Sequence, residues 1–274
     1  MFQSRRKPQG RIGTALAMFE VVYHSIVRNV RKSHNNAFIA IGINMLQVLI
    51  FVLAFYVMFT VLGLRGAALR GDFLIYIMTG IFLYMTHTKT LGAVVGSEGP
   101  ASPMMQHAPM NTIIAIASAA LGTLYIQVLS LFMILFVYHV AFTPVQIDQP
   151  VQAFGMLLLA WFTGAALGLV ALALKPWFPT FVNVATTIYQ RANMIASGKM
   201  FVANTLPSFM LAMFDWNPLF HCIDQARGFS FINYNPRYSS IEYPLYVGVL
   251  LIMLGLMGEF YTRRHASLSW GARR

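Results

Sequence analysis

The sequence predicts an all-α polytopic membrane protein, and three observations support that prediction. Of its 274 residues, 58% are hydrophobic and only 10% are charged, whereas a soluble domain carries about 25% charged residues. Several apolar runs are long enough to cross a hydrocarbon core of about 30 Å. Lys and Arg gather toward the two ends of the chain, where a spanning protein meets anionic lipid. The formal charge of +11 therefore indicates contact with membrane lipid and argues against nucleic acid.

The first expected element, residues 12–32, is an amphipathic helix that lies in the membrane interface. Its apolar residues recur every three or four positions, and charged residues such as Glu20, Arg28 and Arg31 fall on the opposite face. An apolar stripe opposite a basic face is typical of an interfacial helix. An ordinary amphipathic helix packed on a soluble partner is the alternative. No pattern of a cleavable signal follows the basic start of the chain.

Six transmembrane helices are expected next, and they make the whole chain, residues 1–274, a single membrane domain. We expect them within the membrane region 37–261, at about residues 37–64, 73–95, 112–142, 153–174, 181–202 and 244–261. Cytoplasmic segments carry an excess of Lys and Arg. Seven of these residues precede the first span and four follow the last. Six spans thus place both ends in the cytoplasm, although Arg65 and Arg70 then lie outside.

An insert at residues 203–243 separates the fifth and sixth spans, on the expected outer side. It contains two apolar pieces, LPSFMLAMF and NPLFHCIDQARGFSF. Each is too short to cross, so we predict a pair of re-entrant or interfacial helices. Asn217 should cap the second helix, and Pro218 should occupy its first turn, where the missing N–H costs nothing.

Three polar side chains of that second helix are spaced to interact. His221 and Asp224 are three residues apart, as are Asp224 and Arg227, so Asp224 can pair with either. His221 and Asp224 could form an acid–base pair, but a structural hydrogen bond is the favoured interpretation.

Arg191 is the most informative polar residue expected inside the membrane. It lies about ten residues, or roughly 15 Å, into the fifth span, where a charge costs at least about 2.5 to 3.5 kcal/mol. Gln190 and Asn193 flank it, so we expect this side of the span to line a pathway. Lys89 either lines the same pathway or reaches the headgroups, and Lys199 is expected at the outer surface.

Motifs of enzymatic chemistry are missing from the sequence. There is no nucleophile elbow or paired-carboxylate arrangement, and the seven histidines show no metal-ligand spacing. We therefore expect a transport protein, with no enzymatic activity, metal or cofactor of its own. No acid falls in the middle of a span, which disfavours an ion-coupled carrier. Cations without anions along a pathway fit a negatively charged substrate.

The order of these elements resembles the permease subunits of type-2 ABC exporters, in particular the branch that exports capsular polysaccharide and lipopolysaccharide O-antigen. The last outer segment of that branch reads Asn-Pro-Leu, one residue, His, one residue, Ile-Glu, two residues, Arg. This chain matches from Asn217 to Arg227, with Asp224 in place of the Glu. The N-terminal match is looser, because Asn29 stands where the family has Asp and the first span has no Trp.

The resemblance implies a homodimer in the bacterial inner membrane, working with two copies of a separate ATPase subunit that binds ATP and Mg²⁺. Its channel would pass an acidic, lipid-linked polysaccharide of capsule type to periplasmic and outer-membrane export proteins. The insert 203–243 would be the periplasmic gate, with its charges facing water and its apolar side closing the pore. Residues of the interfacial helix and of the cytoplasmic loop after the second span would couple to the ATPase: Arg28, Arg31, Glu98, Pro100, Pro103 and His107. Export of O-antigen or another polymer, and a stand-alone channel or secondary carrier, are the alternatives.

Overall fold

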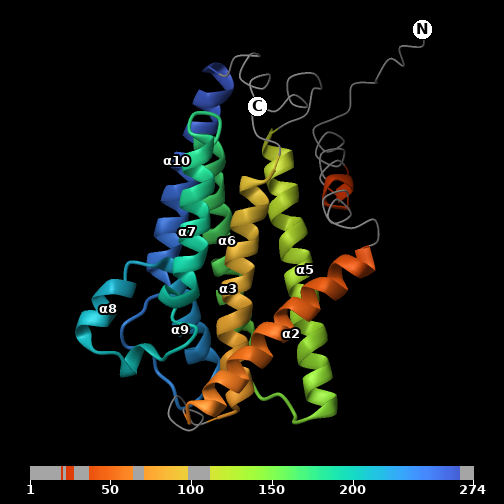
Figure 1. Cartoon of the computed structure of the whole chain (residues 1–274), viewed down its shortest axis with the longest axis vertical. Coiled ribbons are helices and arrows are strands. Elements are labelled where there is room, and N and C mark those ends of the chain that lie inside the picture. Colours follow the sequence, from red (N-terminus) through yellow and green to blue (C-terminus); the bar gives the residue numbers. More distant parts are fainter. Residues whose placement is uncertain (1–19, 21–22, 28–36, 64–70, 98–111, 266–274) are drawn as a thin grey trace.

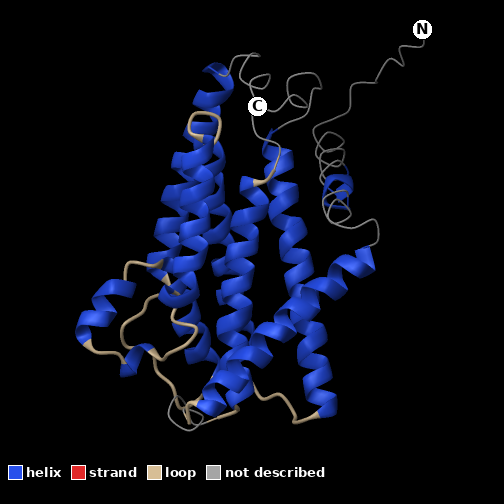
Figure 2. Cartoon of the chain, viewed as in Figure 1, coloured by secondary structure: helices blue, strands red, loops and turns tan. Residues whose placement is uncertain are grey.

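The computed structural model describes residues 20, 23–27, 37–63, 71–97 and 112–265, and all regular structure among them is helical (Figures 1 and 2). The expected all-α class is confirmed. Of the expected interfacial helix, only Glu20 and residues 23–27 are described, and they are helical. His24 Nε2 lies 3.9 Å from a carboxylate oxygen of Glu20, one turn earlier.

The described helices fall into two groups by length. Six have 18 residues or more: α2 (Ala37–Val61), α3 (Phe73–Val95), α5 (Thr112–Ala141), α6 (Pro150–Leu174), α7 (Pro179–Ala196) and α10 (Glu242–His265). Three shorter ones lie between α7 and α10: the 3₁₀ turn η2 (Ala203–Thr205), α8 (Ser208–Phe214) and α9 (Pro218–Ser230).

Four of the long helices are long and apolar enough to cross a membrane, namely Ile41–Val61 of α2, α5, α6 and α10. They identify the chain as a polytopic membrane protein. The helices at the expected second and fifth spans, α3 and α7, form as predicted but are more polar. His87 and Lys89 reduce the apolar character of α3, and Arg191 with its polar neighbours reduces that of α7.

Helix α3 is the centre of the bundle, and most of its residues are buried. It packs on α2, α5, α6 and α9, while α10 covers another face of α6 (Figure 1). Two glycines let α6 approach α3 closely. A Cβ atom at Gly164 would lie 2.5 Å from the carbonyl oxygen of His87, and one at Gly168 would lie 2.9 Å from Cβ of Val94.

Helix α7 is shorter than the span expected at residues 181–202, because it ends at Ala196. The chain then turns at Gly198, whose φ of 76° lies in the left-handed region that glycine adopts without strain. Helix α9 lies beyond the end of α7, at the lower part of the bundle in Figure 1, and packs on α3, α6 and α10. Helix α9 thus packs on α3, α6 and α10 in the part of the bundle beyond the last residue of α7.

Candidate functional site: a buried polar helix and an exposed polar face

Asn217 caps α9 as predicted, and Pro218 is the first residue of the helix. The Asn217 side-chain oxygen accepts a hydrogen bond from the backbone N–H of Leu219 at 3.1 Å. Its amide group donates to the side-chain oxygen of Asn193 at 2.7 Å and to the carbonyl oxygen of Ala196 at 3.0 Å. One side chain therefore starts α9 and joins it to the last turn of α7.

Arg227 closes the end of α7 from the other end of α9. Its guanidinium donates to the carbonyl oxygens of Gly198 at 2.8 Å, Phe201 at 2.6 Å and Lys199 at 2.7 Å. These carbonyls belong to the turn that follows α7, and buried carbonyl oxygens of a turn need hydrogen-bond donors. The guanidinium also lies 4.1 Å from the ring centre of Tyr76, and the residue is only 1% exposed.

Asp224 holds the chain segment that follows α9. Its two carboxylate oxygens accept hydrogen bonds from the hydroxyls of Tyr234, at 2.5 Å, and Ser239, at 2.7 Å. Burial and, after it, the charge of Asp224 raise the pKa of Tyr234. Among the residues that the structure describes, no ion pair joins Asp224 to His221 or Arg227. The expected pairing is wrong because the two hydroxyls occupy the carboxylate and Arg227 is directed to α7.

His221 connects the turn before α9 with the start of α10. Its Nδ1 accepts a hydrogen bond from the backbone N–H of Ser240 at 3.0 Å, so Nε2 carries the hydrogen and donates to the carbonyl oxygen of Asp215 at 2.6 Å. The ring lies 4.7 Å from that of Tyr243. Burial lowers the pKa of His221 and so favours this neutral form.

These four side chains form what we call the α9 brace: Asn217, His221, Asp224 and Arg227. All of them are buried, so the expectation that the charges of the insert face water is wrong for Asp224 and Arg227, whereas Asp215 and Arg237 of the same insert are exposed. Each of these four polar residues of the Asn217–Arg227 pattern binds a segment next to α9. The pattern thus encodes a rigid junction between α7, α9 and α10.

Arg191 lies on a face of α7 that the other described segments of the chain leave open. Asn183, Thr187 and Arg191 follow each other at four-residue spacing, and all three are exposed. We call them the α7 polar stripe. Within the part of the chain that the structure describes, the Arg191 side chain has no hydrogen-bond or ion-pair partner.

Gln190 and Asn193, which were expected beside Arg191 on the same pathway, are directed elsewhere. Gln190 donates to the carbonyl oxygen of Thr88 on α3 at 3.2 Å. Asn193 is buried against Asn217. The structure therefore separates the three residues onto different sides of α7.

Lys89 belongs to a polar cluster that the sequence analysis did not identify. Its ammonium donates to the side-chain oxygens of Asn44 and, at 2.7 Å, of Gln47 on α2. Asn44 also hydrogen-bonds to Ser130 at 2.7 Å and to Gln127 at 3.1 Å, both on α5. Polar residues isolated in apolar spans, as Asn44 and Gln127 are, carry the signal that could have indicated this cluster.

Lys199 does not reach the outer surface as expected. It is 3% exposed, and its ammonium lies 3.5 Å from the ring centre of Tyr84, 5.0 Å from that of Phe55 and 5.5 Å from that of Phe51. Cation–π attraction of this kind strengthens when the cation is removed from water. Lys199 therefore ties the turn after α7 to α2 and α3.

The residues expected to couple to an ATPase lie outside the described residues: Arg28, Arg31, Glu98, Pro100, Pro103 and His107. Among the residues that are described, no three metal-ligating side chains come together. The geometry defines a helical, polytopic membrane protein with a buried polar brace and one exposed polar helix face. No family model matches the sequence, and a comparison with curated proteins found no match.

Proposed function

We propose that the chain is the membrane subunit of an ATP-driven exporter that carries an acidic, lipid-linked polysaccharide of capsule type across a bacterial inner membrane. In this proposal α2, α3, α5, α6, α7 and α10 all cross the membrane, and α8 and α9 form a re-entrant pair on the outer side. Both chain ends are cytoplasmic. Two copies of the chain assemble with two copies of a separate ATPase subunit.

The α7 polar stripe is the observation that carries the proposal. Arg191 is exposed on a helix that packs on α3 and on the apolar span α6. A charge facing lipid at that depth costs at least about 2.5 to 3.5 kcal/mol, so the stripe must meet protein or water. A second copy placed against this face turns Asn183, Thr187 and Arg191 toward a shared pathway. A cation there attracts an acidic polymer.

The α9 brace supports a gating role for the outer segment. Arg227 and Asn217 bind the end of α7 directly, and His221 and Asp224 bind the segment that leads into α10. A tilt of α7 driven by the ATPase would therefore move α9 with it. In this proposal the outer gate opens as a rigid unit with the pathway helix.

The experiment has two parts, and the first tests the class of protein. Affinity purification of the chain from its native membrane in mild detergent should retain a nucleotide-binding subunit with vanadate-sensitive ATPase activity. Purification of the chain without any ATPase would contradict the proposal.

The second part tests the pathway. Arg191→Ala should reduce surface polysaccharide at least about ten-fold, while the chain still assembles with its ATPase. Arg237→Ala, which removes an equally exposed arginine from the outer segment, is the matched control and should export normally. Full surface polymer in the Arg191→Ala strain would refute the pathway role, whatever the first part shows.

A stand-alone channel or carrier is the second candidate, and the polar cluster around Lys89 favours it. The cluster places an ammonium and three side-chain amides between α2, α3 and α5, where an ion could bind. Transport that follows an ion gradient in vesicles free of ATPase would support this candidate. Export of O-antigen or another polymer by the same fold is a further alternative. It predicts the same results for the purification and for Arg191→Ala, except that the surface polymer reduced in the mutant would be a different one.

A further inference from the structure

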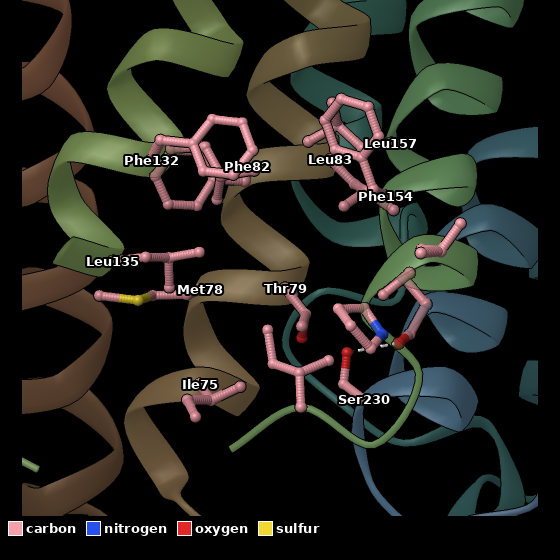
Figure 3. A pocket seen from close by; sticks show the side chains of 16 residues that line it. Ile75, Met78, Thr79, Phe82, Leu83, Phe132, Leu135, Phe154, Leu157 and Ser230 are labelled. Atoms are coloured by element: carbon pink, nitrogen blue, oxygen red, sulfur yellow. Dashed lines mark hydrogen bonds between the residues drawn. The ribbon is translucent and has the colours of Figure 1, made fainter. Parts of the chain in front are cut away.

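An apolar groove opens on the side of the bundle between α5 and α6. Both helices pack on α3 but make few contacts with each other, so α3 forms the floor of the groove. The cavity has a volume of about 350 Å³. Figure 3 shows Ile75, Met78 and Phe82 of α3 along the floor, with Phe132 of α5 and Phe154 of α6 on the two walls.

The groove offers an occupant almost nothing polar. Its two hydroxyl groups, Thr79 and Ser230, already donate to carbonyl oxygens of their own helices, at 2.9 Å and 2.7 Å. Phe132 and Val151 on its rim are 57% and 79% exposed, so the groove opens sideways from the bundle. Because α5 and α6 both qualify as membrane spans, this side faces the hydrocarbon of the bilayer.

A second cavity of about 460 Å³ adjoins the groove; because part of its lining is polar, we call it the polar cavity. The two cavities share Ile75, Ile147 and Ser230 as lining residues. The polar cavity lies where α3 begins and α5 ends, which is the level of the lipid headgroups. An apolar groove that adjoins a polar cavity at this level matches a phospholipid, with an acyl chain in the groove and the headgroup in the polar cavity.

The charge of the polar cavity indicates which headgroup it fits. The charged side chains among its lining residues, Asp72 and Asp148, are both acidic. Asp72 is occupied, because its carboxylate accepts from the backbone N–H of Leu74 at 2.8 Å and from the hydroxyl of Tyr138 at 2.5 Å. Asp148 is exposed, and among the described residues its carboxylate accepts one long hydrogen bond, from the Gln149 amide at 3.4 Å.

We propose that this pair of cavities binds a bilayer phospholipid whose headgroup carries a primary amine, with one acyl chain in the groove and the amine against Asp148. A carboxylate attracts the ammonium of phosphatidylethanolamine and repels headgroups with a net negative charge. The site does not depend on the exporter proposal. It also lies beside α9, since Ala226 and Ser230 of that helix complete the groove wall.

Native mass spectrometry of the full-length chain in mild detergent tests the proposal, with phosphatidylethanolamine and phosphatidylglycerol of identical acyl chains added separately. Phosphatidylethanolamine should bind more tightly. Asp148→Asn should reduce that preference about two- to five-fold, the range for an exposed ion pair. Asp215→Asn removes another exposed acid, in the turn between α8 and α9 and outside both cavities, and should leave the preference unchanged.

A groove-filling variant tests the acyl-chain part. Ala153→Phe places a ring in the groove and should weaken binding of both lipids about ten-fold or more. Val249→Phe enlarges an exposed side chain of α10 and should bind as the wild type does. Equal binding by the two variants, a wild-type preference for phosphatidylglycerol, or an Asp148→Asn chain with unchanged preference would each overturn the proposal.

A measurement on the unaltered chain keeps the test valid if Ala153→Phe fails to fold. Phosphatidylethanolamine with a photoreactive group in one acyl chain should crosslink to peptides within residues 75–83 or 131–157, which form the floor and the walls of the groove. Crosslinks confined to other helices would place the lipid elsewhere and refute the site.

Discussion

Replacing Arg227 by Met should weaken the attachment of α9 to the turn after α7. The free-energy cost can be estimated from the hydrogen bonds of the guanidinium. The guanidinium makes three hydrogen bonds of 2.6 to 2.8 Å to backbone carbonyls, and it is buried. Each buried carbonyl left without its donor costs about 1 to 3 kcal/mol, so the loss of the three bonds should cost at least about 3 kcal/mol. Since 1.4 kcal/mol is a factor of ten in an equilibrium constant, local opening of α9 should become at least about 10² times more frequent.

The single cysteine of the chain provides the assay, because Cys222 lies within α9 and is completely buried. A maleimide dye reaches this thiol only when α9 opens, so the labelling rate follows the population of the open form. The rate should rise by the factor above in Arg227→Met, and by less in Arg227→Lys, which keeps the charge but loses the forked geometry.

Arg237→Ala is the control for the labelling experiment, because it removes an exposed arginine of the segment between α9 and α10. It should label as the wild type does. Labelling of Arg227→Met at the wild-type rate would show that the three hydrogen bonds do not hold α9 in place, and the argument for the brace would fail.

Two further predictions concern His221 and the packing of α3 on α6. Because the pKa of His221 is lowered in the folded chain, the unfolded chain binds the proton first, and stability should fall as the pH drops below about 6.5. His221→Gln should make thermal stability less dependent on pH in this range. His265→Gln, at an exposed position, should leave the pH dependence unchanged. Gly164→Ala, whose Cβ would lie 2.5 Å from the carbonyl oxygen of His87, should destabilise the chain by about 1 to 3 kcal/mol. Gly155→Ala on the same helix meets nothing within 4 Å and should not destabilise in the same assay.

Local sequence rules predicted the helices of this protein and the start of α9. An Asn-Pro pair before an apolar piece specifies an N-cap and a first turn without reference to the rest of the fold, and Asn217 and Pro218 occupy those positions. Four of the six expected spans are apolar enough to be recognised from composition and length. The other two carry more polar residues, some with partners on neighbouring helices, as Gln190 has on α3, and some exposed, as Arg191 is.

The partners of the polar side chains could not be predicted, because they depend on tertiary contacts between distant segments. Spacing on one helix suggested that Asp224 pairs with Arg227, but both face other elements: Asp224 binds Tyr234 and Ser239, and Arg227 binds the turn after α7. The same limit applies to Lys89, whose partners come from α2.

The position of Lys199 shows why counting residues along an expected span is insufficient. Continuous helical geometry through residue 202 would carry Lys199 to the outer surface. The helix instead ends at Ala196 and the chain turns at Gly198, which directs the ammonium inward among three aromatic rings. The turn after α7 buries carbonyls that need donors, and Arg227 of α9 supplies them. The short polar helix α7 and the insert 203–243 therefore depend on each other, because α9 of the insert holds the turn that follows α7.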